Sequence, residues 1–195
     1  MADITLTQAL SRRRTIREFT NAAVSPEVLK RLAWAAQGIT DTEGKRTAPS
    51  AHAIHPLQLF VVANRVDGLD QGVYEVDSLD SGLRMVNRAD VRPALRRAAI
   101  GAPQWIADAA FIVAICADMV TPSRAFAEQK PYGERGVRYV YMEAGAAAQN
   151  LQLQAVAEGL GSVWVGGFND EETANLLDLQ TPLTPIILLC VGYPA

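Results

Sequence analysis

Four guanidinium groups crowd six positions near the start of the chain, at Arg12, Arg13, Arg14 and Arg17, with Thr15 among them. Guanidinium groups repel one another unless water or an anion lies between them, and they form paired, charge-assisted hydrogen bonds with phosphate. A phosphate-binding segment and a solvated basic turn both fit this pattern. Because the whole chain has a net charge of −3, this local excess of cations is informative.

Two other segments are built to let a ligand approach the backbone. Residues 49–56 read PSAHAIHP directly before an apolar run, and residues 165–168 read VGGF. Small residues between prolines indicate a stiff loop, and paired glycines expose the main chain. An ordinary loop is the alternative for each, and VGGF is not the dinucleotide fingerprint. His52 and His55 lie three apart without a carboxylate or cysteine beside them, so we expect no metal site.

A fourth segment, residues 130–139, reads KPYGERGVRY and mixes proton donors with cations. Lys130 and Tyr132 are candidates for proton transfer, and a surface loop with salt bridges is the alternative. The chain contains no paired-carboxylate pattern, no G-x-S-x-G and no phosphate-binding loop of the kinase type. Hydrolase and kinase activities therefore have no support in the sequence.

The elements that position these residues follow from apolar periodicity and from capping residues. We expect helices at 4–13 with Thr5 or Thr7 as the cap, at 26–37 between Ser25 and Gly38, after Asp90, at 138–161, and after Asn169 or Asp170. We expect strands at 57–63, 72–76, 83–86, 109–117, 162–167 and 185–192, with a turn at 78–82, and irregular chain at 39–55 and 119–136. Small residues at 144–148 predict that the long helix is central and closely packed. This order predicts a single α+β domain over residues 1–195, with a mixed sheet covered by helices on both faces.

Composition limits the class of protein. Hydrophobic residues make up 49% and charged residues 20%, which is enough for a globular core, and the negative net charge argues against nucleic acid or anionic membranes as partners. The first residues show no secretory signal, and the apolar runs are far shorter than the roughly 20 residues that span a bilayer. We therefore expect a cytoplasmic protein. Cys116 and Cys190 lie inside apolar runs, which predicts buried free thiols in strands.

Taken in order, the pieces resemble the nitroreductase family of FMN enzymes over nearly the whole chain. The resemblance rests on RRRTIREF, PSAHAIHPLQLFVV, YMEAGAAAQNLQLQAVAEGLGSVWVGGF and ILLCVGYP. Within the family, GVYEVDSLDSGLRMV and KPYGERGVRYVYMEAGAAAQN are most similar to the branch with azoline dehydrogenases of thiazole and oxazole peptide maturation. The chain departs from that branch at His52, at Pro131 between Lys130 and Tyr132, and at Ala146.

The resemblance implies a nitroreductase-like α+β fold, with a mixed, mainly antiparallel central sheet flanked by helices. It also implies an intertwined homodimer with two FMN sites, each built from both subunits. By position, the cofactor contacts fall in the arginine segment, the proline–serine loop, an amide position and the glycine turn: Arg13, Arg14, Thr15, Arg17, Pro49, Ser50, Ala51, His52, Ala53, Gln104, Val165, Gly166, Gly167. The basic residue that often follows the last strand does not occur before Ala195, so we expect the arginine segment to hold the phosphate.

The implied activity is transfer of hydride from NADH or NADPH, by a ping-pong mechanism, to a nitroaromatic, a quinone or a similar small organic acceptor. Residues 119–134 are expected to cover the slot over the flavin. One alternative is a flavin-dependent dehydrogenase or oxidase of the azoline-forming type, in which Lys130 and Tyr132 transfer protons. Another alternative is a flavin-binding module without catalysis.

Overall fold

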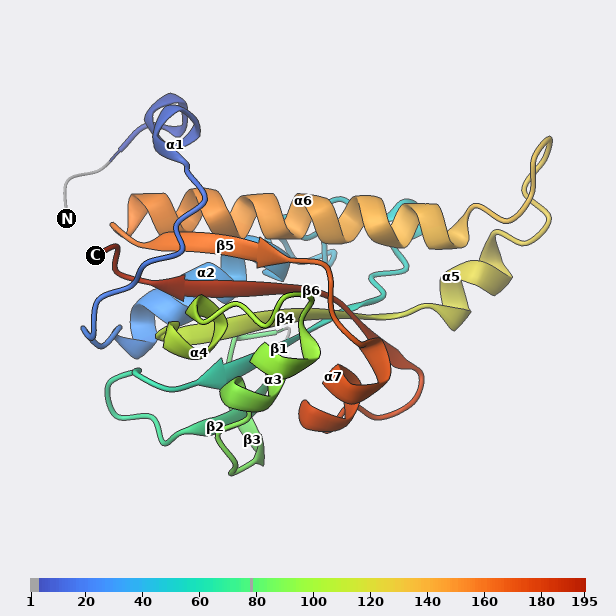
Figure 1. Ribbon diagram of the computed structural model, residues 1–195. Helices are drawn as coiled ribbons and strands as arrows, with labels where there is room; N and C mark the ends of the chain where they lie inside the picture. Colours follow the sequence, from blue (N-terminus) through green and yellow to red (C-terminus); the bar gives the residue numbers. More distant parts are fainter. Residues whose placement is uncertain (1–3, 78) are drawn as a thin grey trace.

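A six-stranded sheet forms the centre of the molecule (Figure 1). The computed structural model describes residues 4–77 and 79–195. The strand order is β3-β2-β1-β4-β6-β5, and every neighbouring pair is antiparallel. The strands are β1 (Leu57–Ala63), β2 (Gly72–Val76), β3 (Leu83–Asn87), β4 (Phe111–Asp118), β5 (Gly161–Val165) and β6 (Leu183–Gly192).

Helices lie on both faces of this sheet, as expected from strands that are apolar on both sides. The helices are α1 (Leu6–Arg12), α2 (Pro26–Gln37), α3 (Arg92–Ala98), α4 (Trp105–Asp108), α5 (Val120–Ala125), α6 (Gly136–Ala157) and α7 (Asp170–Leu176), and a 3-10 turn spans Ala51–Ala53. Helices α2 and α6 cover one face, whereas α3, α4 and α7 lie on the other, and α1 stands apart at one end of α6 (Figure 1).

Alternating side chains of the central strands supply two separate cores. On β4, Val113 and Ile115 pack with α2 and α6, while Ile112 and Ala114 pack with α3, α4 and α7. This is the period of two that a strand imposes on its side chains. Cys116 and Cys190 are buried free thiols on β4 and β6, as predicted.

Two helices show how local sequence sets the frame. In α2, the Ser25 side chain accepts a hydrogen bond from the N–H of Val28, Pro26 begins the helix and Gly38 ends it, as predicted. In α6, Ala144, Ala147 and Ala148 are fully buried, so their small size lets the helix lie close to the sheet and to α2. The prediction of a central, closely packed helix is therefore confirmed.

Several sequence predictions need correction. Helix α4 was not predicted, and α6 spans Gly136–Ala157 where 138–161 was expected. Two further corrections concern aspartates that lie just before the N-terminus of a helix. The stretch predicted as irregular at 119–136 contains α5, because the Asp118 carboxylate accepts hydrogen bonds from the N–H groups of Val120 and Thr121 at 2.8 and 3.1 Å. The N-cap of α3 is Val91, not Asp90. The Asp90 carboxylate accepts a hydrogen bond from the N–H of Arg92 and forms an ion pair with the Arg92 guanidinium at 2.8 Å.

The sheet and its hairpin follow the prediction closely. The mainly antiparallel sheet is confirmed, and parallel pairing is confined to isolated bridges, Thr15 with Ser162 and Val24 with Val66. The predicted hairpin is formed by β2 and β3, and the predicted turn residue Ser78 lies outside the described residues. Within the described chain, no helix combines the length and apolarity that a membrane crossing requires.

Candidate functional site

The arginine segment lies against the beginning of β5, the edge strand of the sheet. Thr15 forms a parallel bridge with Ser162, and the Ile16 N–H donates to the Ser162 carbonyl at 3.0 Å. A Cβ at Gly161 would lie 2.7 Å from the Ile16 side chain, so only glycine permits this approach. On the inner side, the buried Gln152 of α6 donates to the Ser162 hydroxyl at 3.1 Å. The segment is therefore fixed in position on the sheet edge.

The cations of this segment have no counter-charge within residues 4–77 and 79–195. None of Arg12, Arg13, Arg14 and Arg17 forms an ion pair there, and Arg14 Nη1 donates instead to the carbonyls of Ser11 and Arg13. The Thr15 side chain is exposed beside them. Guanidinium groups and a hydroxyl held together in this way form a donor set for an anion such as phosphate.

The glycine turn lies at the other end of the same strand. A Cβ at Gly166 would meet nothing within 4 Å, so a ligand can approach that backbone, whereas a Cβ at Gly167 would lie 3.0 Å from Ile100. The Ile100 N–H donates to the Gly167 carbonyl at 2.9 Å, and the Ile100 side chain is 81% exposed. About four residues of strand, or about 13 Å, separate Ser162 from Gly166. Strand β5 thus connects an anion-binding end with an open, partly apolar end.

Gln104 lies after Ile100, at the beginning of α4. Its side chain is exposed and donates to the Asp108 carboxylate at 2.9 Å. Gln104, the predicted amide contact, therefore lies close in the chain to Ile100, which contacts the glycine turn. The side-chain oxygen of Gln104 takes no part in its hydrogen bond with Asp108.

The proline–serine loop has an unusual backbone. His52, Ala53 and His55 have φ values of 51°, 53° and 49°, the left-handed region that residues other than glycine enter rarely. Each such residue is strained, and strain of this kind persists only where the surrounding structure imposes it. Its concentration at residues 52–55 supports a functional role for the loop that the sequence singled out.

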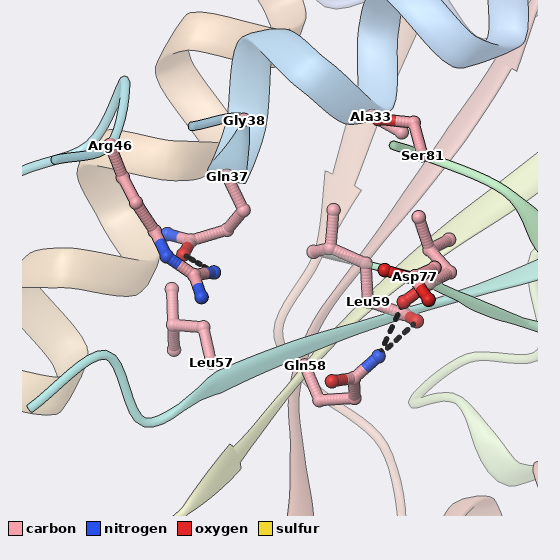
Figure 2. Close-up of a pocket in the computed structure, with 10 residues that line it drawn as sticks. Ala33, Gln37, Gly38, Arg46, Leu57, Gln58, Leu59, Asp77 and Ser81 are labelled. Carbon is pink, nitrogen blue, oxygen red and sulfur yellow. Dashed lines mark hydrogen bonds between the residues drawn. The ribbon is translucent and has the colours of Figure 1, made fainter. Parts of the chain in front are cut away.

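Polar anchors impose this conformation from the inner side. The Asn150 amide of α6 donates to the Thr47 carbonyl at 3.0 Å, and the His55 N–H donates to the Ser50 hydroxyl at 2.9 Å. Arg46 Nη1 donates to the Gln37 side chain at 3.1 Å, and Figure 2 shows the two side chains facing each other above Leu57. The loop is therefore held rigidly by its own chain.

The outer side of the loop contacts the segment that leads into α6. The His52 ring packs edge-on against Phe126 at 5.1 Å between centroids, and Phe126 packs in the same way on Tyr139 at 4.8 Å. Beyond this stack the chain projects past the end of α6 (Figure 1). Lys130 and Tyr132 lie exposed on that projection, with the Arg135 guanidinium 4.9 Å from the Tyr132 ring centroid.

One chain brings only some of the predicted residues together. Arg13 to Arg17, Val165 to Gly167 and Gln104 lie along or near β5. The loop at 49–53 instead shares a small cavity with Pro122, Phe126 and Glu143, near the N-terminal half of α6. From Glu143 to the end of α6 at Ala157 is about 21 Å along the helix axis. The arginine segment and the loop therefore lie at opposite ends of α6.

Three residues at the site were missed by the sequence analysis. Ile100 carries no motif, and only its contact with Gly167 reveals it. Glu143 and Asn150 lie seven residues apart on α6, and this spacing places both on the helix face that carries the small residues. Two polar residues on the face that carries the small residues could have been noticed in the sequence, but not the loop residues that they contact.

The fold and the site define a class of α+β proteins in which a long helix packs on an antiparallel sheet and an arginine-rich N-terminal segment lies against an edge strand. The chain belongs to the nitroreductase family, whose model matches residues 10–193. A protein of Methanocaldococcus jannaschii whose name describes it as a nitroreductase, MJ1384, is 36% identical to this chain over 191 residues. The match covers 97% of this chain and 91% of that protein. Spy0809 of Streptococcus pyogenes, named for an NAD(P)H nitroreductase, is 25% identical over 93% of this chain and 86% of its own length.

Solved structures share the fold. A structure from Anabaena variabilis, named for a nitroreductase, superposes with a TM-score of 0.80 and 23% identity over 97% of this chain, which spans 38% of that longer chain. A chain of the Escherichia coli microcin synthetase McbBCD complex with truncated pro-MccB17 bound superposes with a TM-score of 0.76 and 23% identity, over 100% of this chain and 74% of that chain. The nitroreductase-like fold is therefore confirmed, and family membership makes this chain an oxidoreductase.

Proposed function

We propose that this protein is a cytoplasmic, FMN-dependent oxidoreductase that passes hydride from NADH or NADPH to a nitroaromatic, a quinone or a similar small organic acceptor by a ping-pong mechanism. The observation that carries the proposal is the arrangement on β5. Arginines without an ion-pair partner among the described residues lie at one end of this strand, and an open glycine turn lies at the other, about 13 Å away. FMN has a phosphate joined by a flexible chain to a flat ring. Its phosphate suits the arginine end of the strand, and its ring suits the glycine turn.

The residues present fit FMN. Arg13 and Arg17 with the Thr15 hydroxyl supply donors for the phosphate and for the anionic edge of the ring, and the space at Gly166 leaves room for the ring against the backbone. When bound, FMN itself accepts and donates the hydride, so the protein needs no catalytic acid or base for that transfer. The proposal agrees with the sequence, in which no G-x-S-x-G nucleophile motif occurs.

A second copy of the chain completes the site in this proposal. The loop at 49–53 is preorganised, yet it faces away from the arginine segment of its own chain. The outward side of α6 exposes large apolar side chains, with Tyr141 56% and Met142 65% exposed, and a groove of about 310 Å³ lies between α1, α2 and α6. Exposed apolar surface of this kind indicates an interface. A two-fold axis across α6 would carry the loop of one copy to the β5 edge of the other.

The direct test is an absorbance spectrum of the purified protein, taken before and after each nicotinamide is added without oxygen. We expect a flavin spectrum that bleaches with NADH or NADPH and returns when a quinone is added. A protein that binds FMN but is reduced by neither nicotinamide would contradict the NAD(P)H-driven activity.

The likeness to the McbBCD chain favours a second candidate, a dehydrogenase or oxidase that acts on a peptide-derived substrate. Lys130 and Tyr132 are exposed on the segment between α5 and α6, and in the proposed dimer they would reach a substrate bound over the flavin of the partner. A Lys130→Ala, Tyr132→Phe double variant separates the two candidates. If the variant no longer oxidises the peptide-derived substrate but its flavin is still reduced by NAD(P)H, proton transfer by these residues is favoured. An unchanged rate of substrate oxidation contradicts it.

A further inference from the structure

Four of the six buried side-chain atoms without a hydrogen-bond partner, among the described residues, lie around the proline–serine loop. They are Gln37 Nε2, Arg46 Nε, His55 Nδ1 and Glu143 Oε1. Buried polar atoms are normally paired, so a concentration of unpaired ones needs an explanation. The cluster lies between the end of α2, the loop and α6, on the side of the loop that faces the protein interior.

Glu143 is the acidic member of this cluster, and it is poorly placed for stability. Its side chain is 3% exposed, on a helix face that otherwise buries apolar side chains. Burial raises the pKa of Glu143, although Ser50, Arg46 and Gln37 nearby act in the opposite direction. A group whose pKa is raised by folding stabilises the protein only when it is protonated, so the ionised carboxylate costs stability at neutral pH.

The geometry gives this costly carboxylate a task. Glu143 and Ser50 line the same small cavity, and the Ser50 oxygen also accepts the His55 N–H at 2.9 Å. A hydroxyl has one hydrogen and two lone pairs, so a Ser50 hydroxyl that donates its hydrogen to the carboxylate can still accept from the His55 N–H. Such a contact would fix the ends of the segment that contains the strained residues His52 and Ala53.

We propose that Glu143 is a positioning residue, which holds the Ser50 hydroxyl and with it the strained loop that one subunit presents to the flavin of the other. This role rests on the proposed function, but it concerns a residue that touches neither cofactor nor acceptor. The carboxylate lowers the stability of the free protein and raises its affinity for FMN. A residue that merely fills the core would affect both quantities in the same direction.

Three variants test the proposal in the full-length protein. Glu143→Met keeps the length of the side chain and removes the acceptor, and Glu143→Gln keeps one acceptor oxygen without the charge. Glu158→Gln is the matched control, because Glu158 is a buried carboxylate at the C-cap of the same helix and pairs with Arg31 at 2.6 Å, away from the loop. Since the Arg31 guanidinium lowers the pKa of Glu158, this control should lose stability.

The readouts are the thermal midpoint of the apoprotein, hydrogen exchange at the His55 amide, and FMN affinity by fluorescence titration. For Glu143→Met we expect a higher midpoint at pH 7, with a gain that shrinks toward pH 4.5. We also expect faster exchange at His55 and an FMN dissociation constant about tenfold larger, or about 1.4 kcal/mol. Glu143→Gln should lie between this variant and the wild type, and Glu158→Gln should keep the wild-type exchange and affinity.

Combining Ser50→Ala with Glu143→Met should add little to the loss of affinity, because both act through one contact. Unchanged His55 exchange in Glu143→Met overturns the proposal, whether or not FMN binds. A lower thermal midpoint together with unchanged affinity also overturns it and leaves Glu143 a structural residue. If the wild-type protein itself does not bind FMN, the proposed function fails, and the exchange and stability measurements still decide the role of Glu143.

Discussion

Gly145 of α6 offers the sharpest perturbation of the proposed dimer, because its surroundings differ between one chain and two. A Cβ at Gly145 would meet nothing within 4 Å in the single chain, and the neighbouring Tyr141 and Met142 are exposed on the same side. We consider Gly145→Leu. In one chain the leucine projects into open space and replaces the poorest helix former except proline, so the isolated fold should gain about 0.5–1 kcal/mol.

Between two chains the same leucine blocks a close helix contact. Overpacking costs about 1–3 kcal/mol at each site, and a two-fold interface contains the substitution twice, so association should weaken by about 2–6 kcal/mol per dimer. Every 1.4 kcal/mol is tenfold in the dissociation constant, so the loss is at least about thirtyfold. Flavin binding should fall with it, because each proposed site uses both chains.

The assay is sedimentation equilibrium over a range of concentrations, with urea unfolding of the apoprotein in parallel. Ala147→Leu is the control, since Ala147 is fully buried on the inner side of the same helix and should lose about 1–3 kcal/mol of stability through overpacking. A Gly145→Leu protein that remains a dimer with wild-type FMN affinity would refute the placement of α6 at the interface. Loss of stability equal to that of Ala147→Leu would refute the open surroundings of Gly145.

Three other predictions address the flavin site and the loop. Arg17→Gln removes a charged donor from the sheet edge, so FMN should bind about 1.5–3 kcal/mol more weakly and with less dependence on salt, as measured by titration at two ionic strengths; an unchanged affinity would place the phosphate elsewhere. Gly166→Val fills the space beside the turn, so the apoprotein should fold with a wild-type circular dichroism spectrum and fail to retain flavin on gel filtration, whereas retained flavin would exclude the ring from that position. Burial, with the charge of Arg46, lowers the pKa of His55 below 6.5, so protonation opposes folding and stability should fall as pH drops below 6.5. His55→Asn, which tolerates the left-handed backbone, should reduce that fall in thermal melts from pH 7.5 to 5, and an identical pH profile would contradict it.

Much of the frame could be predicted because local chemistry determines it. Ser25 and Gly38 bound α2, and the nearly continuous apolar runs at residues 57–63 and 109–117 indicate buried strands with both faces covered. The helix α5 was not predicted because its first N–H groups donate to the carboxylate of Asp118, a residue outside the helix that also ends a strand. Sequence patterns assign a residue to one element, and here one side chain serves two.

The candidate site divides in the same way. Arg13, Arg17 and the glycine turn carry recognisable residue types, so sequence alone could single them out. The other site residues act through contacts with residues more than 60 positions away, and these are Ile100, Glu143 and Asn150. The left-handed backbone at His52 is likewise indicated by no sequence pattern. Only the packing of α6 against the loop reveals them.

The measurement that tests the central claim most directly is flavin binding by mixed dimers of two defective chains. One chain carries Arg13→Gln with Arg17→Gln, and the other carries Ser50→Pro, so that neither homodimer should hold FMN. If each site takes its arginines from one subunit and its loop from the other, every mixed dimer has one intact site, and random mixing restores about a quarter of all sites. No recovery of bound FMN from a mixture that demonstrably exchanges subunits would contradict a flavin site built at a seam between two copies.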